Sequence, residues 1–213
     1  MEFLRDEEYR KALKLARDAF LRSNFEERCR IAGAEWIPCD PGGTVNLPFF
    51  QNTCQITIPD FEFSLRGSQN RLSLNNRILI LHYLNGVKDI PVMNENISFK
   101  DVPSGEFYYP AFARRSIEPL LQTFGKAPQA FKSAGESLGG KLVEMGDMGL
   151  KISVFPKVPL TLILWSGDED FSPDLNILFD ATIQEFLSTE DVAVLGQEAM
   201  IRMIKSYYSH LKK

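Results

Sequence analysis

The sequence predicts a single α+β domain over residues 1–213, and three observations carry that prediction. Short segments rich in Val, Ile, Thr and Phe, separated by Pro and Gly turns, fill the N-terminal third. A second strand pair is indicated near residues 150–165, and most helical periodicity comes in the later part of the chain. Strands gathered early and helices gathered late favour α+β over a βαβ alternation.

The first segments are helical. Tyr9, Leu13, Ala16 and Phe20 recur every three to four residues, which predicts an amphipathic helix over residues 7–23. Asn24 is a good N-cap with Glu27 three residues on, and it opens a second short helix that ends near residue 33.

Four short strands follow, at residues 35–37, 44–47, 53–58 and 62–65, joined by turns at Pro38, residues 40–43 and residues 59–60. In residues 53–58 the even positions are apolar. We therefore expect an antiparallel meander with one buried face and one wet face.

A central helix is predicted over about residues 74–85, with Ser73 as its cap and Gly86 as its stop. Its apolar residues point in nearly every direction around the axis: Ile78, Leu79, Ile80, Leu81, Tyr83 and Leu84. Such a helix belongs in the interior.

The remaining elements alternate between strands and helices. We expect an edge segment at 96–102, a turn at 103–105, helices at 111–124 and 128–138, and strands at 150–155 and 160–165. Asp180 should cap a helix over 181–187. Ser188 with Asp191 has the capping-box spacing for a last helix that runs to about residue 210.

Composition bounds the partners and the compartment. A formal charge of −4, from 24 basic and 28 acidic residues, gives no broad positive field for nucleic acid. The N-terminus lacks a signal-peptide pattern, and no apolar stretch is long enough to span a bilayer. The expectation is a cytoplasmic protein with neither nucleic-acid nor membrane partners.

The three cysteines, Cys29, Cys39 and Cys54, are odd in number and widely spaced. They fit neither a disulfide framework nor the paired spacing of zinc sites, so we expect reduced thiols. A three-cysteine metal site with a fourth ligand from elsewhere is the alternative.

An acidic segment over residues 168–180 follows the second strand pair, and it contains Asp168, Glu169, Asp170, Asp174 and Asp180. Carboxylates held together suit Mg²⁺ or Ca²⁺, with Asp168, Asp170 and Asp174 as the ligands. The alternative is a solvated turn whose Asp side chains bond their own backbone.

Two further features have both a functional and a structural interpretation. His82 on the apolar central helix suits an axial ligand of a tetrapyrrole, or else a hydrogen-bonded core residue. An aromatic cluster beside Arg114 and Arg115 suits a flat cofactor or a partner protein, or else fills the core: Phe107, Tyr108, Tyr109 and Phe112 with Trp165 and Phe171.

No catalytic signature is complete. The chain has no Gly-x-Ser-x-Gly elbow, no phosphate-binding Gly-rich loop and only two histidines. We therefore predict a small-molecule or cofactor-binding accessory protein with Tyr83, Arg114, Trp165 and Asp168 lining its pocket. The alternatives are a divalent-metal hydrolase or lyase that uses residues 168–180, and a protein–protein adaptor.

Several blocks resemble the domain-of-unknown-function family 3786 of anaerobic bacteria and archaea. They are residues 77–84, 97–99, 139–140, 146–147, 164–171, 178–180 and 187–191. Some members are similar to fusions with a cysteine-rich iron–sulfur module. The resemblance thus implies a protein partner or a role in redox or corrinoid-dependent metabolism.

Overall fold

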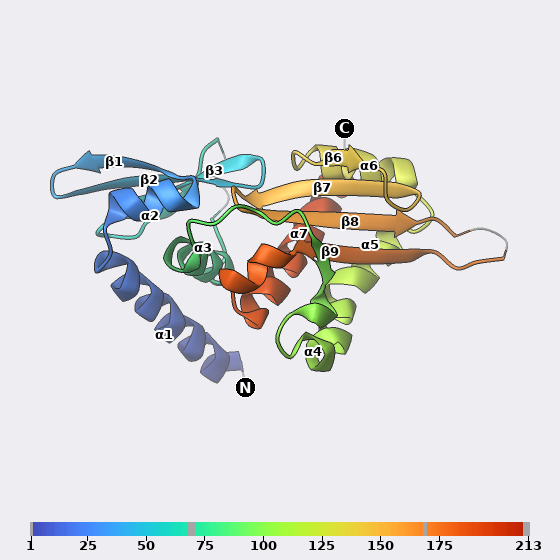
Figure 1. Ribbon diagram of the computed structural model, residues 1–213, viewed down its shortest axis with the longest axis horizontal. Helices are drawn as coiled ribbons and strands as arrows, with labels where there is room; N and C mark the ends of the chain where they lie inside the picture. The colour runs from blue at the N-terminus through green and yellow to red at the C-terminus, as the bar shows by residue number, and fades with distance from the viewer. Residues whose placement is uncertain (1, 68–70, 168–169, 211–213) are drawn as a thin grey trace. The chain divides into compact units, whose positions relative to one another are not determined.

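The protein is an α+β chain with two antiparallel sheets, as predicted (Figure 1). The structure is a computed structural model that describes residues 2–67, 71–167 and 170–210. The chain forms two compact units. Unit 1 contains Met1–Pro91, Phe155–Lys157 and Glu185–Leu187, and unit 2 contains Val92–Val154, Val158–Gln184 and Ser188–Lys213. The single domain over residues 1–213 stays a prediction.

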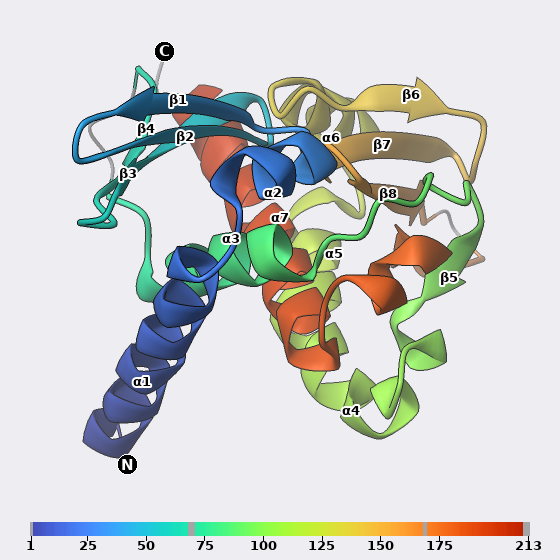
Figure 2. The ribbon, with the colours of Figure 1, turned by 60° about the vertical axis from the view of Figure 1, so that its left-hand side comes forward.

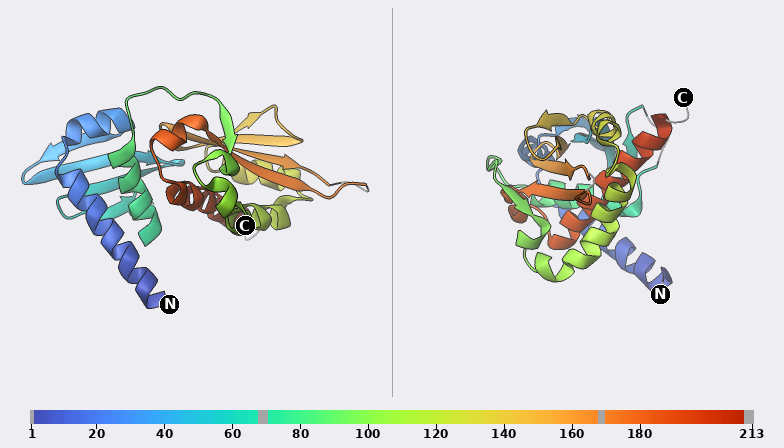
Figure 3. Two further views of the ribbon diagram at one scale, coloured as in Figure 1. Left: turned by 60° about the horizontal axis from the view of Figure 1, so that its bottom comes forward. Right: turned by 90° about the vertical axis from the view of Figure 1, so that its right-hand side faces the viewer.

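Unit 1 combines helices α1 (Glu2–Leu21), α2 (Phe25–Ala32) and α3 (Leu74–Gly86) with a four-stranded sheet. The strands are β1 (Glu35–Cys39), β2 (Gly42–Phe49), β3 (Asn52–Ile58) and β4 (Phe63–Leu65), in the order β1-β2-β3-β4. Helices α1 and α3 lie side by side (Figure 3), and α2 lies against β1 (Figure 2).

The predicted caps and strand faces of unit 1 are confirmed. The Asn24 side chain accepts a hydrogen bond from the Glu27 N–H at 3.1 Å, and Gly33 ends α2 with φ +69°. Along β3 the buried residues are Cys54, Ile56 and Ile58, which alternate with more exposed neighbours. The sheet therefore presents one face to the core and one outward, as period-two patterning requires.

Helix α3 is the central helix of unit 1 and is buried on most sides, as its sequence predicts. The Arg28 guanidinium donates from Nε to the Leu84 carbonyl at 2.9 Å and from Nη2 to the Val87 carbonyl at 2.9 Å. A cation at these carbonyls satisfies groups that the end of a helix leaves unpaired. Gly86 is required here because a Cβ would collide with the Phe186 carbonyl oxygen.

Tyr83 is fully buried in the core of unit 1. Its hydroxyl donates to the Ala32 carbonyl at 2.8 Å and accepts from the Lys157 N–H at 3.3 Å. Its ring stacks on Phe155, with centroids 4.3 Å apart and planes 5° apart. Burial is the main cause that raises the pKa of Tyr83 above its ordinary value.

Unit 2 contains a five-stranded sheet in the order β5-β9-β8-β7-β6; Figure 1 labels β6 to β9, and Figure 2 labels β5. Its strands are β5 (Asn96–Ser98), β6 (Lys141–Val143), β7 (Met148–Phe155), β8 (Val158–Trp165) and β9 (Asp174–Asp180). Its helices are α4 (Gly105–Phe112), α5 (Glu118–Phe124), α6 (Pro128–Glu136) and α7 (Thr189–His210). A π turn (Ala113–Ile117) joins α4 to α5, and 3-10 turns cover Phe99–Asp101 and Ala181–Glu185.

Strand β9 corrects the sequence-based view of residues 168–180 as one acidic loop. Its residues Leu175, Ile177 and Phe179 are buried and pair in register with β8, from Leu160↔Phe179 to Trp165↔Asp174. The acidic residues at both ends, with Asn176 between them, hid this short strand. Only the first part of the segment connects the two strands.

Helix α4 corrects a second boundary, because the helix expected from residue 111 begins at Gly105. A Cβ at Gly105 would collide with the Phe99 carbonyl oxygen, so glycine permits this close start. Pro110 is the sixth residue of this helix, beyond its first turn, and it has no backbone N–H to donate.

Two buried carboxylates, Asp180 and Asp191, form hydrogen bonds at the end of β9 and at the start of α7. Asp180 is 4% exposed and accepts hydrogen bonds from the Met93 N–H, the Thr182 N–H and the Thr182 hydroxyl. Asp191 and Ser188 form the predicted capping box at the start of α7, with Ser188 Oγ donating to Asp191 Oδ2 at 2.6 Å. The aspartate is shorter than the usual glutamate but closes the same exchange of bonds.

Replacing Tyr83 by Phe tests the hydrogen bond from the Tyr83 hydroxyl to the Ala32 carbonyl inside unit 1. We expect a loss of about 1–3 kcal/mol in the free energy of unfolding, because the Ala32 carbonyl loses its buried donor. Urea unfolding followed by circular dichroism measures it. The matched control is Tyr108→Phe, whose ring is 53% exposed. Equal stability of the two variants would contradict the assignment.

Candidate functional site

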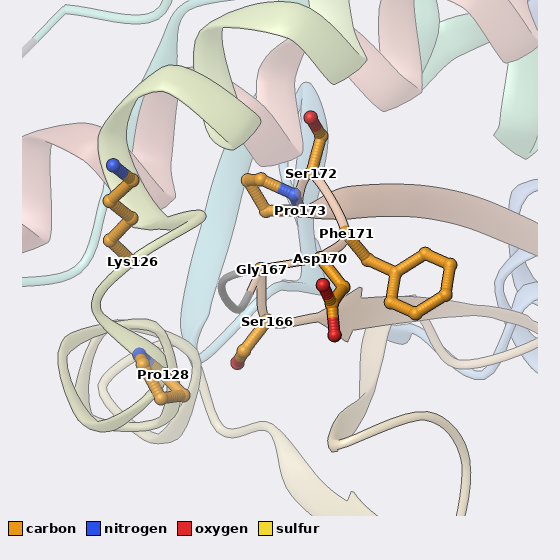
Figure 4. Close-up of a pocket in the computed structure, with 8 residues that line it drawn as sticks. All are labelled: Lys126, Pro128, Ser166, Gly167, Asp170, Phe171, Ser172 and Pro173. Carbon is orange, nitrogen blue, oxygen red and sulfur yellow. The ribbon is translucent and has the colours of Figure 1, made fainter.

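A cleft of about 700 Å³ lies in unit 2 beside the end of the β8–β9 hairpin (Figure 4). Its volume falls within the range of small-molecule sites. Two chain segments form its opposite walls in Figure 4. The lining residues are Lys126, Pro128, Ser166, Gly167, Asp170, Phe171, Ser172 and Pro173.

One wall is the link between α5 and α6. The link contains Lys126, and Pro128 at the start of α6 prevents the two helices from joining. A Cβ at Gly125 would lie 2.7 Å from the Leu121 carbonyl oxygen and 3.0 Å from Pro173 Cγ. The absence of a side chain at Gly125 thus lets Pro173 pack against this wall.

The other wall is the connection from β8 to β9. Its base is fixed by the Trp165↔Asp174 pair and by the Ser166 N–H, which donates to Asp147 Oδ2 at 2.8 Å. A Cβ at Gly167 would lie 2.7 Å from the Pro173 backbone nitrogen, so glycine lets the two ends of the connection approach. The sheet thereby holds Ser166 and Pro173 in defined positions.

The cleft presents groups of both charges and one aromatic surface. Lys126 supplies an ammonium group, and α6 begins beside it without a side-chain cap, which leaves the positive end of the helix dipole uncompensated. Asp170 is exposed and Phe171 is 74% exposed. The ring of Phe171 points away from Lys126 in Figure 4.

The Ser166 hydroxyl is shielded from solvent and has no hydrogen-bond partner within residues 2–67, 71–167 and 170–210. A shielded hydroxyl without a partner is an unsatisfied group that a ligand atom can complete. A serine nucleophile needs a hydrogen-bonded base, and Ser166 has none in the same ranges.

The sequence-predicted pocket residues are spread over both units. Trp165 ends β8 directly before the cleft and is 39% exposed, whereas Asp168 lies outside the described residues. Arg114 is exposed on the π turn and does not line the cleft. Tyr83 belongs to the core of unit 1, and His82 is half-buried on the same helix.

Sequence reasoning missed Lys126 and Pro128, which form the wall opposite the acidic connection. Their only signal is the helix break Gly-Lys-Ala-Pro at residues 125–128. Such a break shows that a link exists but not which strand end it faces. The pairing of these two segments is a tertiary property.

The described carboxylates do not converge on a metal ion. Asp174 and Asp180 stand at opposite ends of a seven-residue strand, which separates them by about 20 Å, and Asp180 is committed to Met93 and Thr182. No group of three His, Cys, Asp or Glu side chains that could hold a metal occurs in the described parts of the chain. Of the predicted ligands, Asp170 lines the cleft and Asp174 lies at its base.

The aromatic cluster near α4 divides between core and surface. Phe112 is 3% exposed and stacks on Phe99 at 4.1 Å. Phe107 and Tyr108 are 81% and 53% exposed and contact each other, so the core interpretation is wrong for this pair. Both rings are therefore exposed on α4, whereas Phe112 at the end of the same helix is buried.

The cysteines are free thiols in three separate places. Cys29 and Cys54 are buried, on α2 and β3, and Cys39 is exposed at the end of β1. Burial raises the pKa of the Cys29 thiol to about 11, against a smaller opposing effect of Arg28. Its thiolate, the reactive form, is therefore scarce at neutral pH.

Comparison with known families identifies a match over most of the chain. A family model described as "Domain of unknown function (DUF3786)" matches residues 24–202. No curated protein and no solved structure matches the chain. No helix within the described ranges is long and apolar enough to cross a membrane.

Thiol labelling at pH 7 should separate the three cysteines. We expect Cys39 to react rapidly, and Cys29 and Cys54 to react only after unfolding, because burial and the raised pKa of Cys29 limit thiolate access. Ellman's reagent with and without urea measures this. Cys39→Ser should abolish the fast phase and leave the slow one, and a fast phase that survives this change would refute the assignment.

Proposed function

The chain belongs to the DUF3786 family, and from this premise we propose that it is a cytosolic accessory protein that binds a small molecule in the cleft beside the β8–β9 hairpin. The observation that carries the proposal is the cleft itself, about 700 Å³ with a shielded, unpartnered Ser166 hydroxyl at its wall. Fixed strands on one side and a helix start on the other make it a preformed site.

The lining favours a ligand with an anionic group and a flat apolar part. Lys126 and the uncapped start of α6 attract negative charge on one wall. Phe171 offers an aromatic face, and Trp165 lies one residue before the lining segment. The hydroxyls of Ser166 and Ser172 supply hydrogen bonds. Flavins, cobalamin and heme combine a large apolar ring with polar or anionic groups, and they are the first probes.

The proposal extends to the setting of the protein. The family resemblance associates the chain with anaerobic bacteria and archaea and with redox or corrinoid-dependent metabolism. An accessory protein that binds a cofactor suits that setting because it needs no catalytic set of its own.

A second candidate function, a protein–protein adaptor, is favoured by one specific observation. Phe107 and Tyr108 expose two contacting aromatic rings on α4. Exposed Arg114 and Arg115 follow on the π turn. Aromatic and arginine side chains are the residues most enriched where proteins bind each other.

Titration with FMN, cobalamin and heme tests the ligand proposal. One of them should raise the melting temperature and change its own absorption spectrum on binding. Lys126→Ala and Phe171→Ala should each weaken that binding by about tenfold, because they remove the cation and the aromatic face. Lys141→Ala, a change at an exposed lysine on β6, is the control. Native mass spectrometry of gently purified protein adds an independent readout. The proposal would be rejected if no probe changed its spectrum, no probe raised the melting temperature and no compound was retained in native mass spectrometry.

The adaptor candidate is tested by a photo-crosslinking amino acid, p-benzoylphenylalanine, at position 107. A discrete crosslinked protein should form from Phe107 but not from the same group at Leu142, a large apolar residue on β6 that is 50% exposed. Identical crosslinking patterns from both positions would count against a specific docking surface.

A further inference from the structure

A second hollow of about 350 Å³ lies in unit 1, on the outer face of the sheet. It is separate from the cleft of unit 2 and shares no residue with it. Most of its lining is polar or backbone: Gly33, Ala34, Glu35, Asn46, Pro48, Thr53 and Arg66.

A row of polar side chains crosses three strands on this face, and two of its members, Glu35 and Asn46, line the hollow. Glu35 on β1 is directly opposite Asn46 on β2, and Asn46 is directly opposite Gln55 on β3. Gln55 Nε2 donates to Asn46 Oδ1 at 3.0 Å, and Asn46 Nδ2 donates to Glu35 Oε2 at 2.9 Å. The donors therefore all point toward the carboxylate at the β1 end of the row.

Asn46 is only 6% exposed although it lies on the outer face. Outer-face polar residues of an antiparallel sheet are normally wet, so enclosure of this amide needs a reason. The two side-chain bonds hold Asn46 in one orientation, and the row forms a fixed polar floor. A fixed floor lowers the ordering cost of binding.

Opposite charges flank this floor. Glu35 is exposed on β1, and Arg66 is exposed directly after β4, where its N–H donates to the Thr53 carbonyl at 2.9 Å. Strands β2 and β3 lie between them, and Arg66 is two residues further along the chain than Ser64, which is in the row of Glu35. The backbones at Glu35 and Arg66 are therefore about 16 Å apart, three strand spacings across the sheet and two residues along it. Within the ranges that the structure describes, neither side chain forms an ion pair.

We propose that this hollow binds a small dipolar molecule, with a cationic amine at Glu35, an anionic carboxylate at Arg66 and Asn46, held by Gln55, beneath it. Arg66 can hold a carboxylate through two parallel N–H bonds. Glu35 keeps oxygen lone pairs beyond the one that Asn46 occupies, and an ammonium group can use them. Glu35 and Arg66 lie on opposite sides of strands β2 and β3. The ligand should therefore have its amine and its carboxylate several bonds apart.

Three matched probes separate the two charges: 5-aminopentanoate carries both, pentylamine only the cation and pentanoate only the anion. We expect 5-aminopentanoate to bind with saturation in calorimetry or NMR titration. Each single-charge probe should bind about tenfold more weakly.

Two variants test the residues. Glu35→Gln and Arg66→Gln should each weaken 5-aminopentanoate binding by about tenfold. For pentanoate only Arg66→Gln should matter, and for pentylamine only Glu35→Gln. Glu62→Gln and Arg22→Gln, changes at exposed residues outside the hollow, are the charge-matched controls. Melting curves verify that all four variants fold.

The outcomes are distinct from those for the cleft of unit 2. Lys126→Ala should leave 5-aminopentanoate binding unchanged, since Lys126 does not line this hollow. Failure of 5-aminopentanoate to bind, equal binding of all three probes, or equal affinity of the Glu35 and Arg66 variants with their controls would each overturn the proposal.

Discussion

A polar atom enclosed by an apolar core needs a partner, and this requirement organises both units of the protein. The central helix α3 is apolar on nearly every side, so its few polar atoms have few places to bond. Tyr83 reaches the Ala32 carbonyl, and Arg28 covers the carbonyls at the C-terminal end of the helix. In unit 2, Asp180 joins the end of β9 to the Met93 backbone in the same way. Each of these contacts links segments far apart in the sequence, and together they determine how the elements pack.

The same requirement distinguishes the two candidate sites. At the cleft of unit 2, the Ser166 hydroxyl is shielded and without a partner, so the protein leaves a polar position for a ligand to fill. At the hollow of unit 1, Asn46 is buried but hydrogen-bonded to both Glu35 and Gln55. There the protein completes the floor and leaves the charges at its two sides for recognition. The cleft of unit 2 contains a hydroxyl that still needs a hydrogen-bond partner, whereas the hollow of unit 1 has a floor whose polar groups are already bonded.

Local signals in the sequence predicted local structure well. The Asn24 cap, the β3 alternation and the Ser188–Asp191 capping box depend on neighbours within a few residues, and all are confirmed. Strand β9 and the early start of α4 were missed, because acidic ends masked one pattern and a tight approach to Phe99 permitted the other. Of the candidate site, the connection after Trp165 was predicted, but the wall that carries Lys126 was not. That wall is set by which helix link faces which strand end, and no local pattern encodes it.

Unit 1 is made of three separate chain segments, and this affects how the chain folds during synthesis. Phe155, which stacks on Tyr83, and the Lys157 N–H, which bonds its hydroxyl, are made more than sixty residues after the last contiguous residue of that unit, Pro91. Phe186, whose carbonyl oxygen lies close to Gly86, is made later still. A ribosome that has released only the first ninety or so residues therefore presents helices and strands around an unfilled aromatic position. The N-terminal unit must wait for the middle of the chain before its interior closes, and a nascent-chain chaperone would find it exposed for most of translation.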